Sequence, residues 1–413
     1  MRPDLPAAAA IAAATLLAAL GALPAGAEGR SLTGALAYRE RIALPPGIEI
    51  AVEVRDAAGA LVAESRSEAG GAQVPLPFSV EVPEGDLTLQ AALVGAGALQ
   101  WIAEPVAVAA GSGPADLGTI ALTRAAQTGF PAIWRCADDI RFALLPRGDG
   151  LRLRHGGTFA DLAPTEAASG AKYEAAGDPA TYAWSKGNRT SFGFGGATHA
   201  DCALAIGETA AAFTARGNEP GWRVVIANGE ATVEGMNIET PITGRAEGPV
   251  AEGTTRTYAI AGQEARIAVE DRLARDDATG MPAPAAVTLT LGGTAMTGTG
   301  GDPGALLTGV LWKATQVGGN PVPAGMEVTL QFLDGGRVAG RSACNRYFGS
   351  YSLTGEGLSF GQAGGTMMAC GDAEMAMEQA FLAGLATVTR FDFDEAGRLV
   401  LLSGDSPAMT FAP

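Results

Sequence analysis

Short runs in which apolar and polar residues alternate recur along this chain of 413 residues, and they limit the folds it can adopt. Clear examples lie at 48–54, 78–82 and 87–91. A period of two places apolar side chains on one face of a strand, so each run predicts a half-buried strand. The 58 glycines and the charged fraction of 17% favour short strands and turns over long charged helices. We therefore expect a mainly β protein.

The length of the chain predicts several domains, because 413 residues exceed one ordinary domain. The strand runs and the turns between them indicate a β-sandwich of antiparallel strands, then a small closed antiparallel β-barrel, a further β domain, and a last domain with strands and a helix. The expected boundaries are 28–124, 130–205, 210–303 and 305–413. The helix is expected near 372–385, with Asp372 as its cap and an apolar stripe of Met375, Phe381, Leu382 and Leu385.

The first 27 residues have the pattern of a secretory signal peptide. Arg2 precedes an apolar run at 7–23, and Ala25-Gly26-Ala27 is a cleavage sequence of small residues before Glu28. We expect a periplasmic or secreted protein cleaved after Ala27, with an uncleaved N-terminal anchor as the alternative. No later segment is apolar over the length of a bilayer, so no transmembrane anchor is expected in the mature chain.

Export would place the four cysteines in an oxidising compartment, where disulfides form. Four cysteines allow three pairings. We predict Cys136–Cys202 and Cys344–Cys370, because each pair then falls within one expected domain. The alternative is a zinc site, but the chain has no CxxC spacing, and its two histidines form no ligand pattern. No metal or cofactor is predicted.

The formal net charge of −16 restricts the partners of the protein. An acidic chain is repelled by nucleic acid and by anionic membrane surfaces, so neither is an expected partner. A basic protein would be attracted at long range. The plainer interpretation is that the acidic surface keeps the protein soluble. The sequence carries no signal for an oligomeric state.

The segment from Cys136 to Cys202 contains two motifs that carry a functional resemblance. They are Ser169-Gly170-Ala171-Lys172-Tyr173 and Trp184-Ser185-Lys186-Gly187. With the flanking cysteines, they resemble the MliC-type inhibitors of c-type lysozyme, which are small β-barrels. The resemblance implies that c-type lysozyme is the partner and that Ser169 and Lys186 enter its active-site cleft. Gly170, Lys172, Tyr173, Trp184 and Gly187 would support the two loops.

A departure from the MliC pattern lies between the two motifs. Residues 174–181 look like a small insertion relative to the family. Such an insertion, if it protruded beside the inhibitory loops, would block docking or alter the preference for one lysozyme over another.

Two further resemblances point to the bacterial envelope. The opening of the mature chain resembles the YbaY/YscW-type lipoprotein domain, a small β-sandwich, through Tyr38-Arg39-Glu40-Arg41-Ile42-Ala43-Leu44-Pro45-Pro46. The last domain resembles the META (HslJ-type) family of small α/β domains. This resemblance rests on two motifs, Gly340-Arg341-Ser342-Ala343-Cys344-Asn345-Arg346-Tyr347-Phe348-Gly349-Ser350-Tyr351 and Thr366-Met367-Met368-Ala369-Cys370.

The third domain gives only a weak indication of an enzyme. Its Gly217-Asn218-Glu219-Pro220-Gly221-Trp222 resembles a motif of uncharacterised envelope proteins. The chain has no nucleophile elbow, zinc-protease, P-loop or Rossmann motif, so we do not expect an enzyme. Glu219 is the acidic residue to examine in a pocket, and the pairs Asp138-Asp139 and Asp276-Asp277 are expected in solvated turns. The other alternative is a non-inhibitory stress or structural protein that binds envelope components through its first and last domains.

Overall fold

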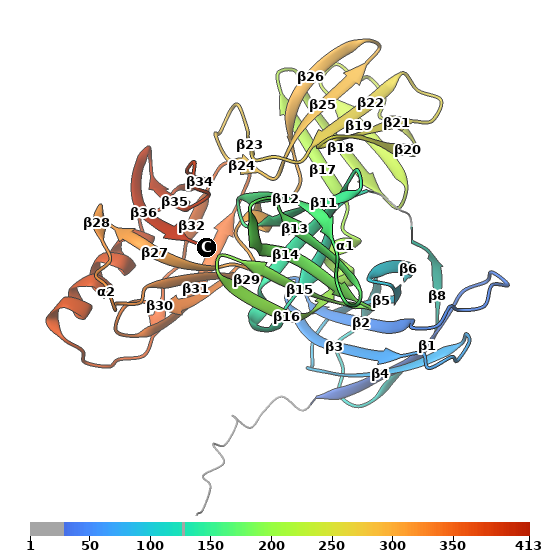
Figure 1. Cartoon of the computed structure of the whole chain (residues 1–413), viewed down its shortest axis with the longest axis horizontal. Coiled ribbons are helices and arrows are strands. Elements are labelled where there is room, and N and C mark those ends of the chain that lie inside the picture. The colour runs from blue at the N-terminus through green and yellow to red at the C-terminus, as the bar shows by residue number, and fades with distance from the viewer. Residues whose placement is uncertain (1–28, 126–128) are drawn as a thin grey trace, which may run out of the picture.

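The computed structural model describes residues 29–125 and 129–413, and the signal-peptide prediction lies outside them. Strands form most of the structure, which confirms the prediction of a mainly β, multidomain protein. Four bodies follow one another along the chain, and the second of them lies at the centre (Figure 1). Its neighbours are the first body, in blue, the third, in yellow, and the fourth, in red.

The first domain has two β layers joined by one long strand. Strand β8 pairs with β1 in one layer through residues 115–121 and with β6 in the other through 122–124. The β1–β8 pair is parallel, so the expectation of purely antiparallel strands is wrong at this one position. The strands are β1 Arg30–Ala37, β2 Glu49–Asp56, β3 Leu61–Glu68, β4 Leu76–Val82, β5 Leu87–Gly95, β6 Ala98–Ala103, β7 Val106–Val108 and β8 Ala115–Arg124.

Strand β2 corrects the expectation of a half-buried strand. Its first six residues are all buried, including the acidic Glu49 and Glu53. The second domain covers the face that carries Glu49 and Glu53, since Ala51 between them packs into the core of that domain. By contrast, β4 alternates between buried and exposed residues as predicted, because solvent covers its polar face.

The second domain is a closed eight-stranded barrel, as predicted. Its core is aromatic and aliphatic, with Phe142 stacked on Phe192 at 4.3 Å between ring centroids. The Cys136–Cys202 disulfide is present. The strands are β9 Ala132–Arg135, β10 Arg141–Arg147, β11 Gly150–His155, β12 Thr158–Thr165, β13 Ala171–Ala175, β14 Asp178–Lys186, β15 Arg189–Phe194 and β16 Ala197–Leu204, with the 3-10 turn η1 Ala137–Asp139 after β9.

A histidine lies in the core of this barrel. His155 stacks on Phe142 at 4.6 Å, and its Nδ1 lies 2.9 Å from the carbonyl oxygen of Arg141. Burial lowers the pKa of His155 to about 4, because the charged imidazolium would lose its hydration. The side chain is therefore neutral in the folded protein at physiological pH.

The third domain is a second closed barrel. The short helix α1 Ile206–Thr209 connects it to the second domain. A loop beyond β22 leaves the barrel and inserts Met281 into the core of the fourth domain. The strands are β17 Phe213–Asn218, β18 Gly221–Ala227, β19 Glu230–Gly235, β20 Ile242–Glu252, β21 Thr255–Ile260, β22 Ala265–Glu270, β23 Ala274–Arg275, β24 Pro282–Ala283, β25 Ala285–Leu291 and β26 Thr294–Gly300.

The fourth domain packs one helix against a strongly bent sheet. Helix α2 Asp372–Leu385 buries Phe381 and Leu385, and Met377, not the predicted Met375, packs beside them. The elements are η2 Pro303–Leu306, β27 Leu311–Val317, β28 Asn320–Pro321, β29 Thr329–Leu333, β30 Arg337–Arg341, β31 Arg346–Leu353, β32 Leu358–Phe360, β33 Gly364–Gly365, α2, β34 Arg390–Phe393, β35 Leu399–Ser403 and β36 Ser406–Ala412.

The start of α2 differs from the prediction. Gly371 occupies the capping position and offers no side chain, while Asp372 is the first helical residue. The prediction that Asp372 caps the helix is therefore wrong. A carboxylate in the first turn still interacts favourably with the helix dipole.

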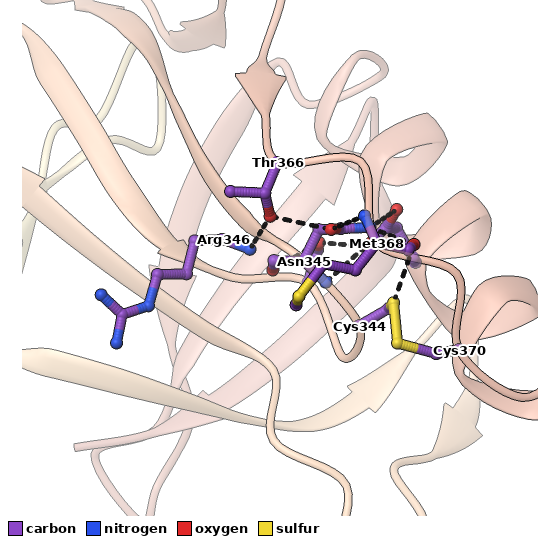
Figure 2. The surroundings of a disulfide bond; sticks show 8 residues. Cys344, Asn345, Arg346, Thr366, Met368 and Cys370 are labelled. Carbon is purple, nitrogen blue, oxygen red and sulfur yellow. Dashed lines mark hydrogen bonds between the residues drawn. A yellow bond between two sulfur atoms is a disulfide. The ribbon is translucent and has the colours of Figure 1, made fainter.

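The two META-like motifs of the fourth domain stabilise its fold. The Cys344–Cys370 disulfide is present, and Asn345 beside it connects two segments (Figure 2). The Asn345 side-chain oxygen accepts hydrogen bonds from the Thr366 hydroxyl and the Met368 amide, both at 2.8 Å. Disulfide and amide together hold the loop before α2 in place.

A buried carboxylate connects the first domain to the second and to α1. Glu53 of β2 is fully buried. It accepts hydrogen bonds from the backbone amides of Ile206 and Gly207 at 2.9 and 3.2 Å. Arg66 and Arg135 lie 3.5 and 3.7 Å from the same carboxylate. A buried charge with these partners resists separation, because parting the domains would leave it unpaired.

A second ion cluster connects the fourth domain to this junction. Arg141 of β10 pairs with Glu208 of α1 at 3.1 Å and with Asp334, between β29 and β30, at 2.9 Å. Arg55 of the first domain pairs with the same two carboxylates at 3.2 and 3.4 Å. Residues from three domains and the connecting helix therefore share one set of charges.

The Glu53→Gln variant tests the buried carboxylate. The amide keeps the shape but removes the buried negative charge that Arg55, Arg66 and Arg135 share, so the free energy of unfolding should fall by about 3 kcal/mol. Urea denaturation followed by tryptophan fluorescence measures this change. Glu81→Gln on the exposed face of β4 is the matched control and should change stability little. Equal stability of the two variants would contradict the assigned role.

The buried neutral His155 predicts a pH dependence of stability. Its folded pKa of about 4 lies below the unfolded value of 6.5, so protons bind preferentially to the unfolded chain. Its contribution is present above pH 6.5 and is lost, up to about 3 kcal/mol, as the pH falls towards 4. We expect His155→Phe to show a shallower acid slope than the unaltered protein in urea denaturation at each pH. Parallel slopes would refute this.

Candidate functional site

Strand order places the two predicted loops at the same end of the second domain. Successive turns of an up-and-down barrel alternate between its ends. The loop between β12 and β13, which carries Ser169, and the turn between β14 and β15, which carries Gly187, are two turns apart. Ser169 and Lys186 are both exposed. The barrel therefore brings together the residues that the sequence separates by 17 positions.

Glycine 170 allows the two loops to touch. Its φ of +74° lies in the left-handed region, and a β-carbon there would stand 2.1 Å from the carbonyl oxygen of Ser185. The indole nitrogen of Trp184 donates a hydrogen bond of 2.8 Å to the carbonyl oxygen of Ser169. The position of Ser169 is thus fixed from the neighbouring strand.

Lys186 is the exposed cation of this site. Its ammonium nitrogen lies 3.9 Å from the centroid of the Trp184 ring, a cation–π contact that holds the side chain over the strand. No carboxylate of the described residues pairs with it within 4 Å. Lys172, in contrast, forms an ion pair with Glu174 and lies over the Tyr182 ring at 5.1 Å. Lys186 is therefore the lysine that remains available to a partner.

The sequence alone missed a residue that positions the Lys186 turn. The Asn188 side chain accepts a hydrogen bond from the Gly97 amide at 3.1 Å and donates one to the Gly47 carbonyl at 2.9 Å. Both glycines belong to the first domain. A Gly-Asn pair between two strands does predict a tight turn, but nothing in the sequence relates that turn to residues some 90 positions earlier.

The extra residues 174–181 lie away from the two loops. They form the far end of the β13–β14 hairpin, where Glu174 pairs with Tyr182 and Ala175 pairs with Asp178 across a bulge. The hairpin runs about 13 Å from Ala171 to Ala175 at the usual rise per residue. The concern that this insertion obstructs the loops is thus not supported by the fold. Tyr173, by comparison, is half-buried and packs against the barrel core.

Other residues named from the sequence lie elsewhere and have structural surroundings. Glu219 is exposed at the β17–β18 turn, not enclosed in a pocket. Asp276 is buried, so the prediction that it lies in a solvated turn is wrong. Burial alone would raise its pKa, but hydrogen bonds from Thr279, Asn218 and Ala278 lower it. All four cysteines lie in disulfides, so the zinc alternative is wrong.

Comparison with known families assigns three of the four domains. Residues 27–110 match the type III secretion system lipoprotein chaperone family, YscW. Residues 134–201 match the membrane-bound lysozyme-inhibitor of c-type lysozyme family, MliC. Residues 305–413 match the META domain family. The chain is a mosaic of these domains. Its MliC-type barrel contains the Ser169 and Lys186 loops, so it belongs at family level with lysozyme inhibitors.

No curated protein matches this chain. One similar solved structure is an alternative pilotin from the type II secretion system of Vibrio cholerae. It is 23% identical and covers 24% of this chain and 99% of its own, with a TM-score of 0.21. A protein from Burkholderia xenovorans is 31% identical and covers 26% and 82%, with a TM-score of 0.23.

The YscW-type and MliC-type domains, together with two disulfides, indicate an exported protein. Within residues 29–125 and 129–413, no helix has the length and apolar character needed to cross a membrane.

The Trp184→Phe variant tests how the Ser169 loop of the MliC-type barrel is held. Phenylalanine keeps the ring but removes the indole donor, whose hydrogen bond contributes about 1 kcal/mol. Amide hydrogen exchange at 169–171 should accelerate by about fivefold. Tyr182→Phe is the control, because Tyr182 lies on the same face without contacting that loop through a hydrogen bond. Unchanged exchange in Trp184→Phe would show that the loop is held by other contacts.

Proposed function

We propose that the protein inhibits c-type lysozyme by inserting the Ser169 and Lys186 loops into the active-site cleft. The observation that carries this proposal is the meeting of the two loops at one exposed end of the MliC-type barrel, with a hydrogen bond from Trp184 to Ser169 and a cation–π contact from Lys186. Loops fixed before binding lose little conformational freedom when they bind.

The chemistry of the two side chains suits the target. Lysozyme cleaves glycosidic bonds with two carboxyl groups, one protonated and one ionised. The Ser169 hydroxyl can donate a hydrogen bond to a carboxylate or accept one from a protonated acid. The Lys186 ammonium can pair with the ionised carboxylate, and exclusion of water from the cleft strengthens this pair.

The charge of the whole protein also favours this partner. With a net charge of −16, the chain attracts a basic protein at long range, and c-type lysozymes are usually basic. The local charge at the loops is the opposite. Two of the three lysines in the chain, Lys172 and Lys186, lie on this face, and Lys186 would meet the acidic cleft. Long-range steering and local pairing are thus supplied by different residues.

Inhibition of lysozyme would protect peptidoglycan, which places the protein in the envelope. We infer that the leader is cleaved after Ala27 and that the mature chain acts in the periplasm or outside the cell. The rival is a non-inhibitory envelope protein that works through its YscW-type and META domains. Asn188 brings the first domain close to the Lys186 turn. This contact would favour the rival if the first domain kept lysozyme from reaching Lys186.

The double variant Ser169→Ala, Lys186→Ala tests the mechanism. It removes one hydrogen bond and one charge-assisted pair, so the Kd for lysozyme should rise by about a hundredfold. Calorimetry measures binding, and hydrolysis of a cell-wall suspension measures inhibition. Lys313→Ala is the matched control, because Lys313 is the third lysine and lies on β27 of the META domain.

Two results would decide against the proposal. Full inhibition by the double variant would refute the roles of Ser169 and Lys186. Failure of the unaltered protein to bind any c-type lysozyme would refute the function and favour the rival.

A further inference from the structure

A cavity of about 360 Å³ lies where the four domains meet, and it is distinct from the lysozyme-binding loops. Arg55 of the first domain, Arg154 of the second, Arg256 of the third and Tyr351 of the fourth all line it. Strand β12 separates the cavity from the Ser169 loop. Gly156, just before β12, lines the cavity, whereas Ser169 lies just after the other end of the strand. Eight residues of strand span about 25 Å. Its volume is that of a small-molecule site.

The cavity contains a buried cation that forms no direct ion pair. Arg154 is 6% exposed, and its Nη1 donates a hydrogen bond to the carbonyl oxygen of Ala305. Among the described residues, no carboxylate lies within 4 Å of its guanidinium group. Burial lowers the pKa of Arg154 to about 10, so the side chain still carries its charge at neutral pH. A buried unpaired charge is costly and is ordinarily compensated.

The two carboxylates whose charges raise the pKa of Arg154, Asp302 and Asp271, have their hydrogen bonds with other groups. Asp271 pairs with Arg256 at 2.7 Å. Asp302 accepts a hydrogen bond of 2.9 Å from the Gly304 amide at the start of η2. The other cations of the cavity, Arg55 and Arg141, are paired with Glu208 and Asp334. Arg154 is therefore the lining cation left for a ligand.

Much of the remaining wall is apolar and aromatic, and Thr209 and Thr308 add hydroxyl groups to it. The apolar and aromatic side chains come from three domains: Phe130, Phe142, Leu145, Phe159, Phe213 and Tyr351. Such walls exclude water from one side of the guanidinium group and offer contact area to an apolar body.

We propose that this cavity binds a small organic anion, with a carboxylate on Arg154 and an aliphatic or aromatic body against the apolar walls. The ligand is a class that combines one negative charge with an apolar chain or ring. Because all four domains line the cavity, its binding would stabilise their arrangement by mass action.

Fluorescence of anilinonaphthalene sulfonate with the full mature chain tests this site. The probe is an aromatic anion and should bind with enhanced emission. Decanoate should displace it, whereas decanol, which has the same chain without the charge, should displace it at least about tenfold less well. Arg154→Met should weaken probe binding about tenfold or more. Arg223→Met is the control, because Arg223 is exposed on β18 and lies outside this cavity.

Either of two outcomes would overturn the proposal. One is equal displacement by decanol and decanoate, which would show that charge is not recognised. The other is undiminished binding by a folded Arg154→Met protein, with folding checked by circular dichroism. Should that variant fail to fold, the competition in the unaltered protein decides by itself.

Discussion

The carboxylate of Glu53 is the interaction on which the arrangement of the domains depends. It lies on the strand face that would meet solvent in an isolated sandwich, yet it is fully buried beneath the second barrel. Its oxygens accept hydrogen bonds from the first amides of α1, and three arginines, Arg55, Arg66 and Arg135, surround it. Because a buried carboxylate is tolerated only with such partners, the first domain, the barrel and the connecting helix have one favourable relative position.

Fixing the barrel gives its two ends different surroundings. One end presents the Ser169 and Lys186 loops to solvent. At the opposite end, the β11–β12 turn packs against the META domain, where Gly156 and Gly157 lie against Trp312 and Phe393. Only the absence of β-carbons allows this approach. The META domain and the Ser169 and Lys186 loops therefore lie at opposite ends of the barrel.

Patterns of neighbouring residues predicted the strands of each domain, but they did not predict the contacts between domains. Alternation identified the strands, because a strand's pattern depends on neighbouring residues, and both cysteine pairs were identified because each falls within one domain. The burial of β2 was missed, since its acidic face is covered by residues 80 or more positions away. The loops were found through their motifs. Asn188 and Arg154 were missed, because their partners belong to other domains.

The contact between Asn188 and the first domain bears on how such mosaics can evolve. If the barrel were transferred to another protein without the first domain, it would keep its disulfide and its strands. It would lose the foreign backbone groups that orient the turn after Lys186. Recombination at the linkers would therefore transfer the fold more readily than the geometry of this turn, which depends on the first domain as well as on the barrel.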